Sequence, residues 1–505
     1  MHQRMFAAFL AAIFAAFLPA APAAAQKAKD ELRPIWRNVV PNIDSYYNGL
    51  RDGIVFAHHV WDHLIERDPE TFAYKPGLAT EWKWVDDVTL DVQLRQGVKF
   101  HDGSAFGAED VAHTFNFVAD PANKALYQRN TNWIKKVDIL DGHKVRIHLH
   151  RPFPPAIDFL SMPMFVYSRN YKGPEEMNRR PIGTGPYRVV SLDQGKDYKF
   201  ERFAEHYAGS PKSGATIQRI HARTITDRAT ELAELLAGNA DLIWYVDADQ
   251  LPNIQRRRNL QILQAEAMRI GYLALDAAGR TGAGNPLTKQ KVRHAIAHAI
   301  DREGYVRNLV QGEARVIHAP CFPLQFGCDD SLAPRYAFDP AKAKRLLAEA
   351  GYPNGFKTQL FAYRVRDWTE AIQADLKGVG IDAEVQMLPV STFIQKFQKG
   401  ETPMGQGDWG SFSVNDASAV VSTFFKDTED DYARDPEVKA LLDVADNASD
   451  PAVRKDHYRR AIGRIMEQAY WLPLHTFVTN YAFTADLEFR AYKDEIPRYW
   501  VYRWK

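Results

Sequence analysis

The chain has only two cysteines and almost no excess of either charge. Its 64 basic and 63 acidic residues give a net charge of +1, so no broad electrostatic attraction for nucleic acid is expected. Beyond the first 25 residues, no apolar and uncharged run is long enough to cross a bilayer. Short-period repeats and low-complexity tracts are also missing, which argues against a solenoid. These absences favour a globular protein without a transmembrane helix and without a nucleic-acid partner.

Several motifs of catalysis and nucleotide binding are missing as well. The sequence has no G-x-S-x-G, no H-E-x-x-H and no S-x-x-K with a K-T-G box, which are patterns of common hydrolases. It also lacks the G-x-x-x-x-G-K-[ST] loop that holds ATP phosphates, and it implies no cofactor. We therefore expect a protein that is not an enzyme, with a periplasmic hydrolase as the less favoured alternative.

The N-terminal residues have the features of a secretory signal peptide. Arg4 precedes an apolar run over residues 5–18, Pro19 ends that run, and three alanines follow at 23–25. The run is too short to span a bilayer, and the small residues match a cleavage site before Gln26. Cleavage there would leave no cysteine at the new N-terminus for a lipid anchor. The sequence therefore predicts a signal peptide over residues 1–25 and export, unanchored, to a bacterial periplasm.

Cys321 and Cys328 lie seven positions apart in a loop that contains proline and glycine. In an oxidising compartment such a pair is expected to form a disulfide, which would stabilise the fold by about 2–3 kcal/mol in the chain-entropy model. Two free thiols or a metal site are the alternatives, although the spacing does not match a zinc knuckle.

Apolar spacing indicates strands and helices in alternation along the chain. Residues 89–100 alternate apolar and polar side chains, as a half-buried strand does, and a helix is predicted to begin near Gly107. Residues 291–300 have helical spacing, and Asp301 is predicted to cap a second helix that stops at Gly312.

The second half of the chain has clearer helix boundaries. Asp339 is predicted to cap a helix that starts at Pro340 and ends at Gly351. Residues 372–388 are typical of a helix, a glycine turn and a strand, and residues 435–471 are mostly helical in pattern. The roughly 480 residues that remain after cleavage are too many for one core, so two or three α/β domains in at least two lobes are expected.

Five segments, in this order, resemble the peptide/nickel-type solute-binding proteins of bacterial ABC importers, family 5. They are LATEWKWVDDVTLDVQLRQGVKFHDGSAFGAEDV (78–111), PIGTGPYRVVS (181–191), KVRHAIAHAIDREGYVRNLVQGEA (291–314), FDPAKAKRLLAEAGYPNGF (338–356) and YRRAIGRIMEQAYWLPLH (458–475). The glycines of the FHDG and GTGPY stretches suit sharp turns, and GTGPY lacks the residues that would make it a phosphate loop.

The resemblance implies an α/β, bilobal periplasmic-binding-protein fold of type II, with three domains that include an extra domain II. It places domain I at 26–62, 181–269 and 477–505, domain II at 63–180, and domain III at 270–476. It also implies a monomer that closes its lobes on a peptide or other small molecule and docks on an inner-membrane ABC permease with separate ATPase subunits. A metal chelate, haem, an opine or a sugar conjugate is the alternative cargo.

The stretch DWGSFSVNDAS at 408–418 is the first candidate ligand site. Peptide binders of the family place an acidic residue after the matching tryptophan, where it pairs with the amino group of the ligand. Counted from Trp409, that position is Phe412, and the D-P pair that follows in the family falls on Asn415 and Asp416. Either Asp416 or Asp408 replaces the missing charge, or the ligand has no free α-amine, because a buried ammonium without a counter-charge is costly.

Three further groups of residues are weaker candidates. Arg364 and Arg366 could hold a ligand carboxylate, or they are a solvated pair in a loop. His59 and His63 stand four apart and could bind a transition metal from one helical face, although they match an ordinary helix of domain I. The terminal RYWVYRW, residues 498–504, is interpreted as a final packed strand.

Overall fold

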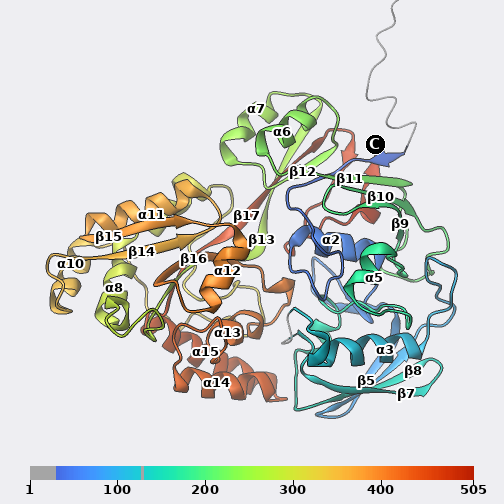
Figure 1. Cartoon of the computed structure of the whole chain (residues 1–505), viewed down its shortest axis with the longest axis horizontal. Helices are drawn as coiled ribbons and strands as arrows, with labels where there is room; N and C mark the ends of the chain where they lie inside the picture. Colours follow the sequence, from blue (N-terminus) through green and yellow to red (C-terminus); the bar gives the residue numbers. More distant parts are fainter. Residues whose placement is uncertain (1–29, 127–129) are drawn as a thin grey trace, which may run out of the picture.

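The computed structural model describes residues 30–126 and 130–505. The predicted signal peptide, residues 1–25, therefore lies outside the described residues. No helix in the described ranges is both long and apolar enough to cross a membrane. Figure 1 shows two lobes with two long strands, β13 and β17, between them. The first lobe contains the elements from β1 to α7 and the C-terminal residues 487–505, and the second lobe contains α8 to α15.

The first lobe is built around two sheets and several short elements. A five-stranded sheet has the order β1-β11-β10-β9, with β2 also paired to β11, and an antiparallel sheet has the order β5-β6-β8-β7. The strands are β1 (Glu31–Leu32), β2 (Ile35–Trp36), β5 (Ala79–Asp86), β6 (Thr89–Leu94), β7 (Ile134–Asp141), β8 (Lys144–Leu149), β9 (Tyr187–Asp193), β10 (Asp197–Arg202) and β11 (Arg219–Thr224).

In this lobe, helix α3 lies beside β7 and β8, whereas α6 and α7 lie apart from these two sheets, near β12 (Figure 1). The helices are α2 (Arg51–Val60), α3 (Ala108–Ala119), α4 (Ala156–Phe159), α5 (Pro174–Arg179), α6 (Arg228–Leu236) and α7 (Leu251–Gln255). The smaller elements are β3 (Ile65–Arg67), β4 (Tyr74–Pro76), η1 (Pro121–Asn123), η3 (Ala248–Gln250), β18 (Leu487–Glu488), η7 (Tyr499–Val501) and β19 (Arg503–Trp504).

A six-stranded sheet with the order β12-β17-β13-β16-β14-β15 runs from one lobe into the other. Its strands are β12 (Leu242–Trp244), β13 (Leu260–Leu275), β14 (Phe356–Ala362), β15 (Ile381–Met387), β16 (Met404–Trp409) and β17 (Trp471–Thr484). The helical elements of the second lobe are η4 (Pro286–Thr288), α8 (Gln290–Ala299), α9 (Arg302–Tyr305), η5 (Val306–Val310), α10 (Pro340–Glu349), α11 (Arg366–Gly378), α12 (Val390–Gln398), η6 (Ser411–Ser413), α13 (Ser418–Phe424), α14 (Pro436–Asn447) and α15 (Pro451–Glu467).

Strand β13 changes its neighbours halfway along its length. Its first half pairs only with β17, near β12, whereas Ile270–Leu275 pair with β16 of the second lobe as well. The register of the β13–β17 pair shifts between Ala267 and Ile270, which leaves Met268 and Arg269 in an irregularity of the ladder. Bulges of this kind bend a strand and redirect a side chain. The predicted domain boundaries at 269/270 and 476/477 fall within these two strands, and the three-domain division stays a prediction.

Several local predictions match the elements that form. Leu90, Val92 and Leu94 are buried on β6, as the alternation requires. Asp339 accepts a hydrogen bond from the Lys342 backbone N–H at 2.8 Å at the start of α10. Asp301 caps α9 as expected, but that α-helix ends at Tyr305 and the chain continues as a single π-helical turn, η5. The cap therefore forms, and the predicted helix is shorter and less regular.

Two predictions about helix and strand extent are wrong. Helix α2 ends at Val60, so His63 is not on the same helical face as His59; it lies beyond the helix end, in a β-bridge with Phe165. Residues 498–504 form the turn η7 and the two-residue strand β19 instead of one packed strand.

The glycines of GTGPY are needed for a close backbone approach. A Cβ on Gly183 would lie 1.8 Å from the Val60 carbonyl oxygen, and one on Gly185 would lie 2.6 Å from the His59 carbonyl oxygen. Gly183 also accepts a hydrogen bond from the His101 backbone N–H, at 2.8 Å. GTGPY therefore packs on the end of α2 and on the FHDG turn.

Candidate functional site

The stretch 408–418 links the second lobe to the first. It begins at the end of β16, passes through the turn η6 and enters α13. Ser411, Phe412 and Ser413 have φ values of 52°, 50° and 60°, so three consecutive residues with side chains are left-handed. Each such residue costs on the order of 1 kcal/mol, so the turn must be held in place by its surroundings.

First-lobe side chains hold this turn, which we call the interlobe turn (residues 411–415). Arg51 on α2 donates to the Ser413 hydroxyl at 3.1 Å, and Arg67 on β3 donates to the Ser413 carbonyl oxygen. Arg67 also pairs with Asp158 at 2.9 Å, and the Asn415 backbone N–H donates to the same carboxylate. The structure therefore has the two lobes in contact through buried, charge-assisted hydrogen bonds.

The two aromatic side chains of the stretch pack against different cores. Trp409 is partly buried against the second-lobe core, and its indole N–H donates to the Ala419 carbonyl oxygen at 2.8 Å. Phe412 packs against the first-lobe core, with its ring edge-on to Trp409 at 5.3 Å between centroids. Both rings therefore lie where the lobes meet. Their contact with a ligand stays a prediction.

Asp416 is committed to structural partners. Its carboxylate accepts from Arg454 at 2.7 Å, from the Ser418 backbone N–H at 3.0 Å and from the Tyr458 hydroxyl at 3.3 Å. The single hydroxyl hydrogen of Tyr458 is shared with Asp446, which is closer, at 2.9 Å, and which pairs with Lys426 at 2.7 Å. We call these residues the Asp416 cluster: Asp416, Asp446, Arg454, Lys426 and Tyr458. The cluster has two acids and two bases, so the negative charge of Asp416 is already paired and is not available to a ligand ammonium group.

Asp408 is likewise committed, but to a cluster at the junction of the lobes. Arg364 donates to it through Nε at 2.5 Å and Nη2 at 2.9 Å, Tyr363 donates at 2.8 Å, and Arg269 pairs with it as well. Burial alone would raise the pKa of Asp408, but Arg364 and Arg269 hold it well below its ordinary value. The carboxylate is therefore ionised and saturated by donors from the protein.

Arg269 connects this carboxylate to the first lobe. From the irregularity in β13 its Nε donates to Glu495 at 3.0 Å, while Arg51 reaches the same oxygen only at 3.4 Å. We call the five charged residues the junction cluster: Arg51, Arg269, Arg364, Asp408 and Glu495. The Arg364 side chain is 43% exposed, whereas the other four are 12% exposed or less. One arginine side chain of an otherwise buried cluster is thus partly exposed to solvent.

The Tyr245 side chain interacts electrostatically with the arginines and with Glu495 of the junction cluster. Its φ is 56°, and Arg37 donates to its carbonyl oxygen at 2.7 Å, which holds the strained backbone. Burial, followed by the negative charge of Glu495, raises the pKa of Tyr245 to about 12. The phenol therefore stays protonated and can donate a hydrogen bond.

The remaining predicted residues do not join this site. Arg366 is exposed and pairs at 3.3 Å with Glu370 one helical turn along α11, so it is the solvated residue of the arginine pair. Both imidazoles of the metal alternative have partners on both nitrogens. His59 contacts the Val55 carbonyl oxygen at 2.7 Å and the Tyr499 backbone N–H at 3.0 Å.

His63 contacts the Met162 carbonyl oxygen at 2.7 Å and Glu66 at 3.1 Å. The two histidines therefore do not form a metal site. Within the described ranges, no group of three or more histidine, cysteine, aspartate or glutamate side chains could hold a metal ion.

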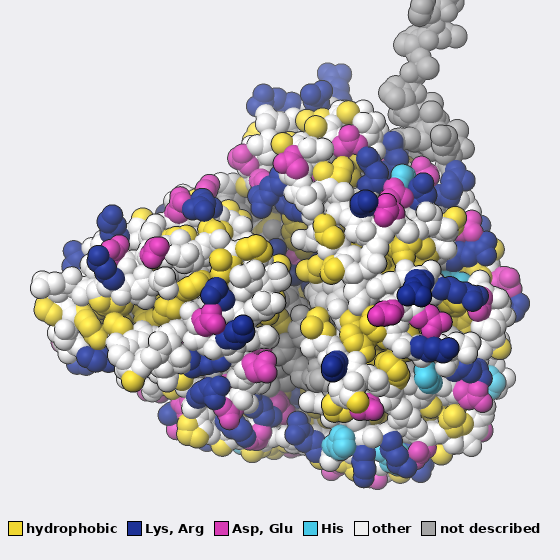
Figure 2. Space-filling model, viewed as in Figure 1, with side chains coloured by type: hydrophobic (Ala, Val, Ile, Leu, Met, Phe, Trp, Pro, Cys, Tyr) yellow, Lys and Arg dark blue, Asp and Glu magenta, His cyan; other side chains and the backbone are white. Residues whose placement is uncertain are grey.

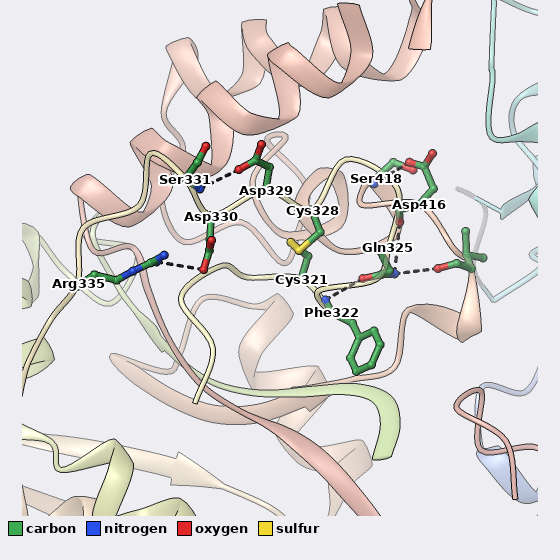
Figure 3. Close-up of a disulfide and its surroundings, with 11 residues drawn as sticks. Cys321, Phe322, Gln325, Cys328, Asp329, Asp330, Ser331, Arg335, Asp416 and Ser418 are labelled. Atoms are coloured by element: carbon green, nitrogen blue, oxygen red, sulfur yellow. Dashed lines mark hydrogen bonds and ion pairs between the residues drawn. A yellow bond between two sulfur atoms is a disulfide. The ribbon is translucent and has the colours of Figure 1, made fainter. Parts of the chain in front are cut away.

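The loop closed by the Cys321–Cys328 disulfide supports the interlobe turn from the second lobe (Figure 3). The Gln325 amide donates to the Val414 carbonyl oxygen at 2.8 Å, and the Phe326 backbone N–H donates to the Asn415 carbonyl oxygen at 3.1 Å. A pocket of about 710 Å³ lies beside this loop. Its polar lining residues include Arg315, His318, Gln325, Asp329, Asn415 and Lys455. Asn415 is thus the one predicted ligand-binding residue that lines the pocket, together with the predicted disulfide pair Cys321 and Cys328.

Sequence reasoning missed Arg51, Arg269, Glu495 and Tyr245. Each is far from the others along the chain, and no motif contains them. The only local signal is Arg269, a charged residue within the otherwise apolar second half of β13.

Two α/β lobes, joined by two long strands and separated by a groove on the face shown in Figure 2, define a bilobal solute-binding protein. Residues 73–432 match the family described as bacterial extracellular solute-binding proteins, family 5 Middle. The chain belongs to this family.

The names of proteins similar to this chain refer to different ligands. The chain is 27% identical to heme-binding protein A of Haemophilus influenzae, over 83% of this chain and 82% of that protein. It is also 27% identical to the glutathione-binding protein GsiB of Escherichia coli K12, over 77% and 78%. The crystal structure of a dipeptide-binding protein from Pseudoalteromonas in complex with Met-Leu has the same fold, with a TM-score of 0.82 and 23% identity over 94% of this chain and 100% of that chain.

Proposed function

We propose that the chain captures a small solute, peptide-like by default, between its lobes and delivers it to an ABC permease whose ATPase subunits are separate chains. The proposal rests on the way in which the two lobes are joined. The long strands β13 and β17 join the lobes, and the interlobe turn is fastened across them by Arg51 and Arg67. Hinge closure around a ligand is an established mode of capture.

The arrangement favours binding without chemistry. The carboxylates of Asp408 and Glu495 are paired with arginines, and two of these arginines hold Asp408 ionised, so Asp408 is poorly suited to transfer protons. The family consists of solute-binding proteins, and we propose that this member also leaves its solute unaltered. Export to the periplasm through the signal peptide is part of the same proposal.

The experiment uses protein that has been unfolded, washed free of bound solute and refolded. We expect one class of small molecule to raise its midpoint of thermal unfolding, because a ligand that binds only the native state stabilises it by mass action. Mass spectrometry of the solute before and after incubation should show no product. A solute that emerges cleaved would replace the proposal with the hydrolase alternative, and a protein that no solute stabilises would contradict it.

A further inference from the structure

The lobe junction has more positive than negative charge. Four carboxylates lie there, those of Asp158, Asp408, Asp494 and Glu495, and each has a guanidinium partner. Arg67 pairs with Asp158, Arg269 and Arg364 with Asp408, Arg498 with Asp494, and Arg269 with Glu495. Arg51 is the fifth guanidinium. Five positive groups therefore meet four negative ones.

Arg51 is the least satisfied member of this set. It is 7% exposed, its Nε has no hydrogen-bond partner among the described residues, and its nearest carboxylate oxygen, on Glu495, is 3.4 Å away and already bound by Arg269. Its remaining contact is with the neutral Ser413 hydroxyl. A buried guanidinium without a full counter-charge is unfavourable, so the junction would gain from a further negative group.

An ammonium group, by contrast, has no acceptor at the predicted position. Phe412 replaces the acidic residue, Asp416 is saturated by Arg454 and its neighbours, and Asp408 is saturated by three side chains. The open edge of the junction is the exposed side of Arg364, whose Nε and Nη2 face Asp408. A guanidinium with one edge free binds a carboxylate in a planar, directional way.

We propose that the solute is an anion whose carboxylate binds at Arg364, the exposed arginine of a junction with excess positive charge, and that it presents no free α-ammonium group to residues 408–416. This inference rests on the proposed function and narrows its solute class.

The test varies the ligand, so that no protein variant has to fold. Stripped and refolded protein is titrated calorimetrically with matched sets: free dipeptides, their N-acetyl derivatives and their C-terminal amides, and sugar acids with their parent sugars. We expect the compounds that bind to carry a carboxylate. Conversion of that carboxylate to an amide should weaken binding about 10- to 100-fold, as for the loss of a charge-assisted pair, whereas N-acetylation should change it less than about threefold.

The outcomes separate this inference from the proposed function. If amides or parent sugars bind as well as the acids, or if N-acetylation abolishes binding, the anion inference is wrong and solute capture stands. If neither the matched sets nor a small-molecule extract of the native periplasm binds, solute capture itself is wrong. A phosphorylated compound that binds while every carboxylate fails would also overturn the carboxylate assignment.

Discussion

Two buried ion clusters in this protein include aspartates of the same stretch, Asp408 and Asp416, and differ in charge balance. The Asp416 cluster matches two acids with two bases, and Arg454 donates hydrogen bonds to Asp416, Tyr458 and the Ala445 carbonyl oxygen. The junction cluster has three arginines for two carboxylates, and one of those arginines is partly exposed to solvent. Balance is typical of a structural cluster, because each unpaired buried charge destabilises the fold. We propose that the excess positive charge of the junction cluster is completed by a ligand.

We expect the largest effect on stability when an ion pair of the balanced Asp416 cluster is removed. Arg454→Ala leaves Asp416 buried without its counter-charge, and we expect the free energy of unfolding to fall by about 3–5 kcal/mol. Denaturant unfolding at neutral pH measures the loss. Arg460→Ala is the matched control, because Arg460 lies on the same helix α15 with a half-exposed side chain and should change stability by no more than about 0.5 kcal/mol. Equal effects of the two variants would show that the Asp416 cluster does not contribute as described.

A substitution at the contact between the lobes should change how far the lobes close. Arg67→Ala removes a donor to Ser413 and leaves Asp158 unpaired in the closed form, but opening of the lobes can rehydrate that carboxylate. Burial raises the pKa of Asp158 in spite of Arg67, which indicates how costly the ionised group is when the lobes are closed.

We therefore expect the Arg67→Ala variant to be more open without ligand, with an apparent affinity lower by up to about 100-fold, because binding must then also supply the free energy of closure. Small-angle scattering measures the change as a larger radius of gyration. The double variant Arg67→Ala/Asp158→Asn should recover part of the closure. An Arg67→Ala variant as compact as the unchanged protein would contradict the role of the interlobe turn.

Asp52 is a buried carboxyl of a third kind and extends the comparison of the two ion clusters. Asp52, next to Arg51 on α2, accepts hydrogen bonds from Asn38 and has no ion-pair partner among the described residues, and burial raises its pKa to about 6. A raised pKa means that stability present below the unfolded pKa of about 4 is lost as the pH rises through about 6. Asp52→Asn should therefore stabilise by about 2 kcal/mol at pH 8 relative to its effect at pH 4. A pH-independent difference in unfolding free energy would contradict the assignment.

The local sequence pattern was sufficient to predict several strands and helix caps, but not to predict which charged residues pair with one another. The alternation of β6, the Asp339 cap of α10 and the Cys321–Cys328 disulfide all follow from residues that are neighbours in sequence. The predicted helix through His63 was wrong because the chain leaves α2 at Val60 to meet Phe165, a contact that spacing does not contain.

The candidate site at 408–418 and Arg364 stays a prediction as a ligand site, and the sequence did not indicate the ion pairs that its residues make. Asp408 and Asp416 look equivalent in sequence. Their difference depends on Arg269 and on Arg454, which lie far from them along the chain. Arg51 and Glu495 reach the junction from opposite ends of the sequence, so no local signal could have paired them.

The central claim, that a solute is held at the lobe junction by an unbalanced arginine cluster, is tested most directly by two substitutions two positions apart. Calorimetric titration with a carboxylate-bearing solute that binds the unchanged protein compares Arg364→Gln with Arg366→Gln, whose side chain is exposed and outside the cluster. The account predicts an affinity lower by about 10- to 100-fold for the first variant and an unchanged affinity for the second. Equal affinities for both variants would contradict it.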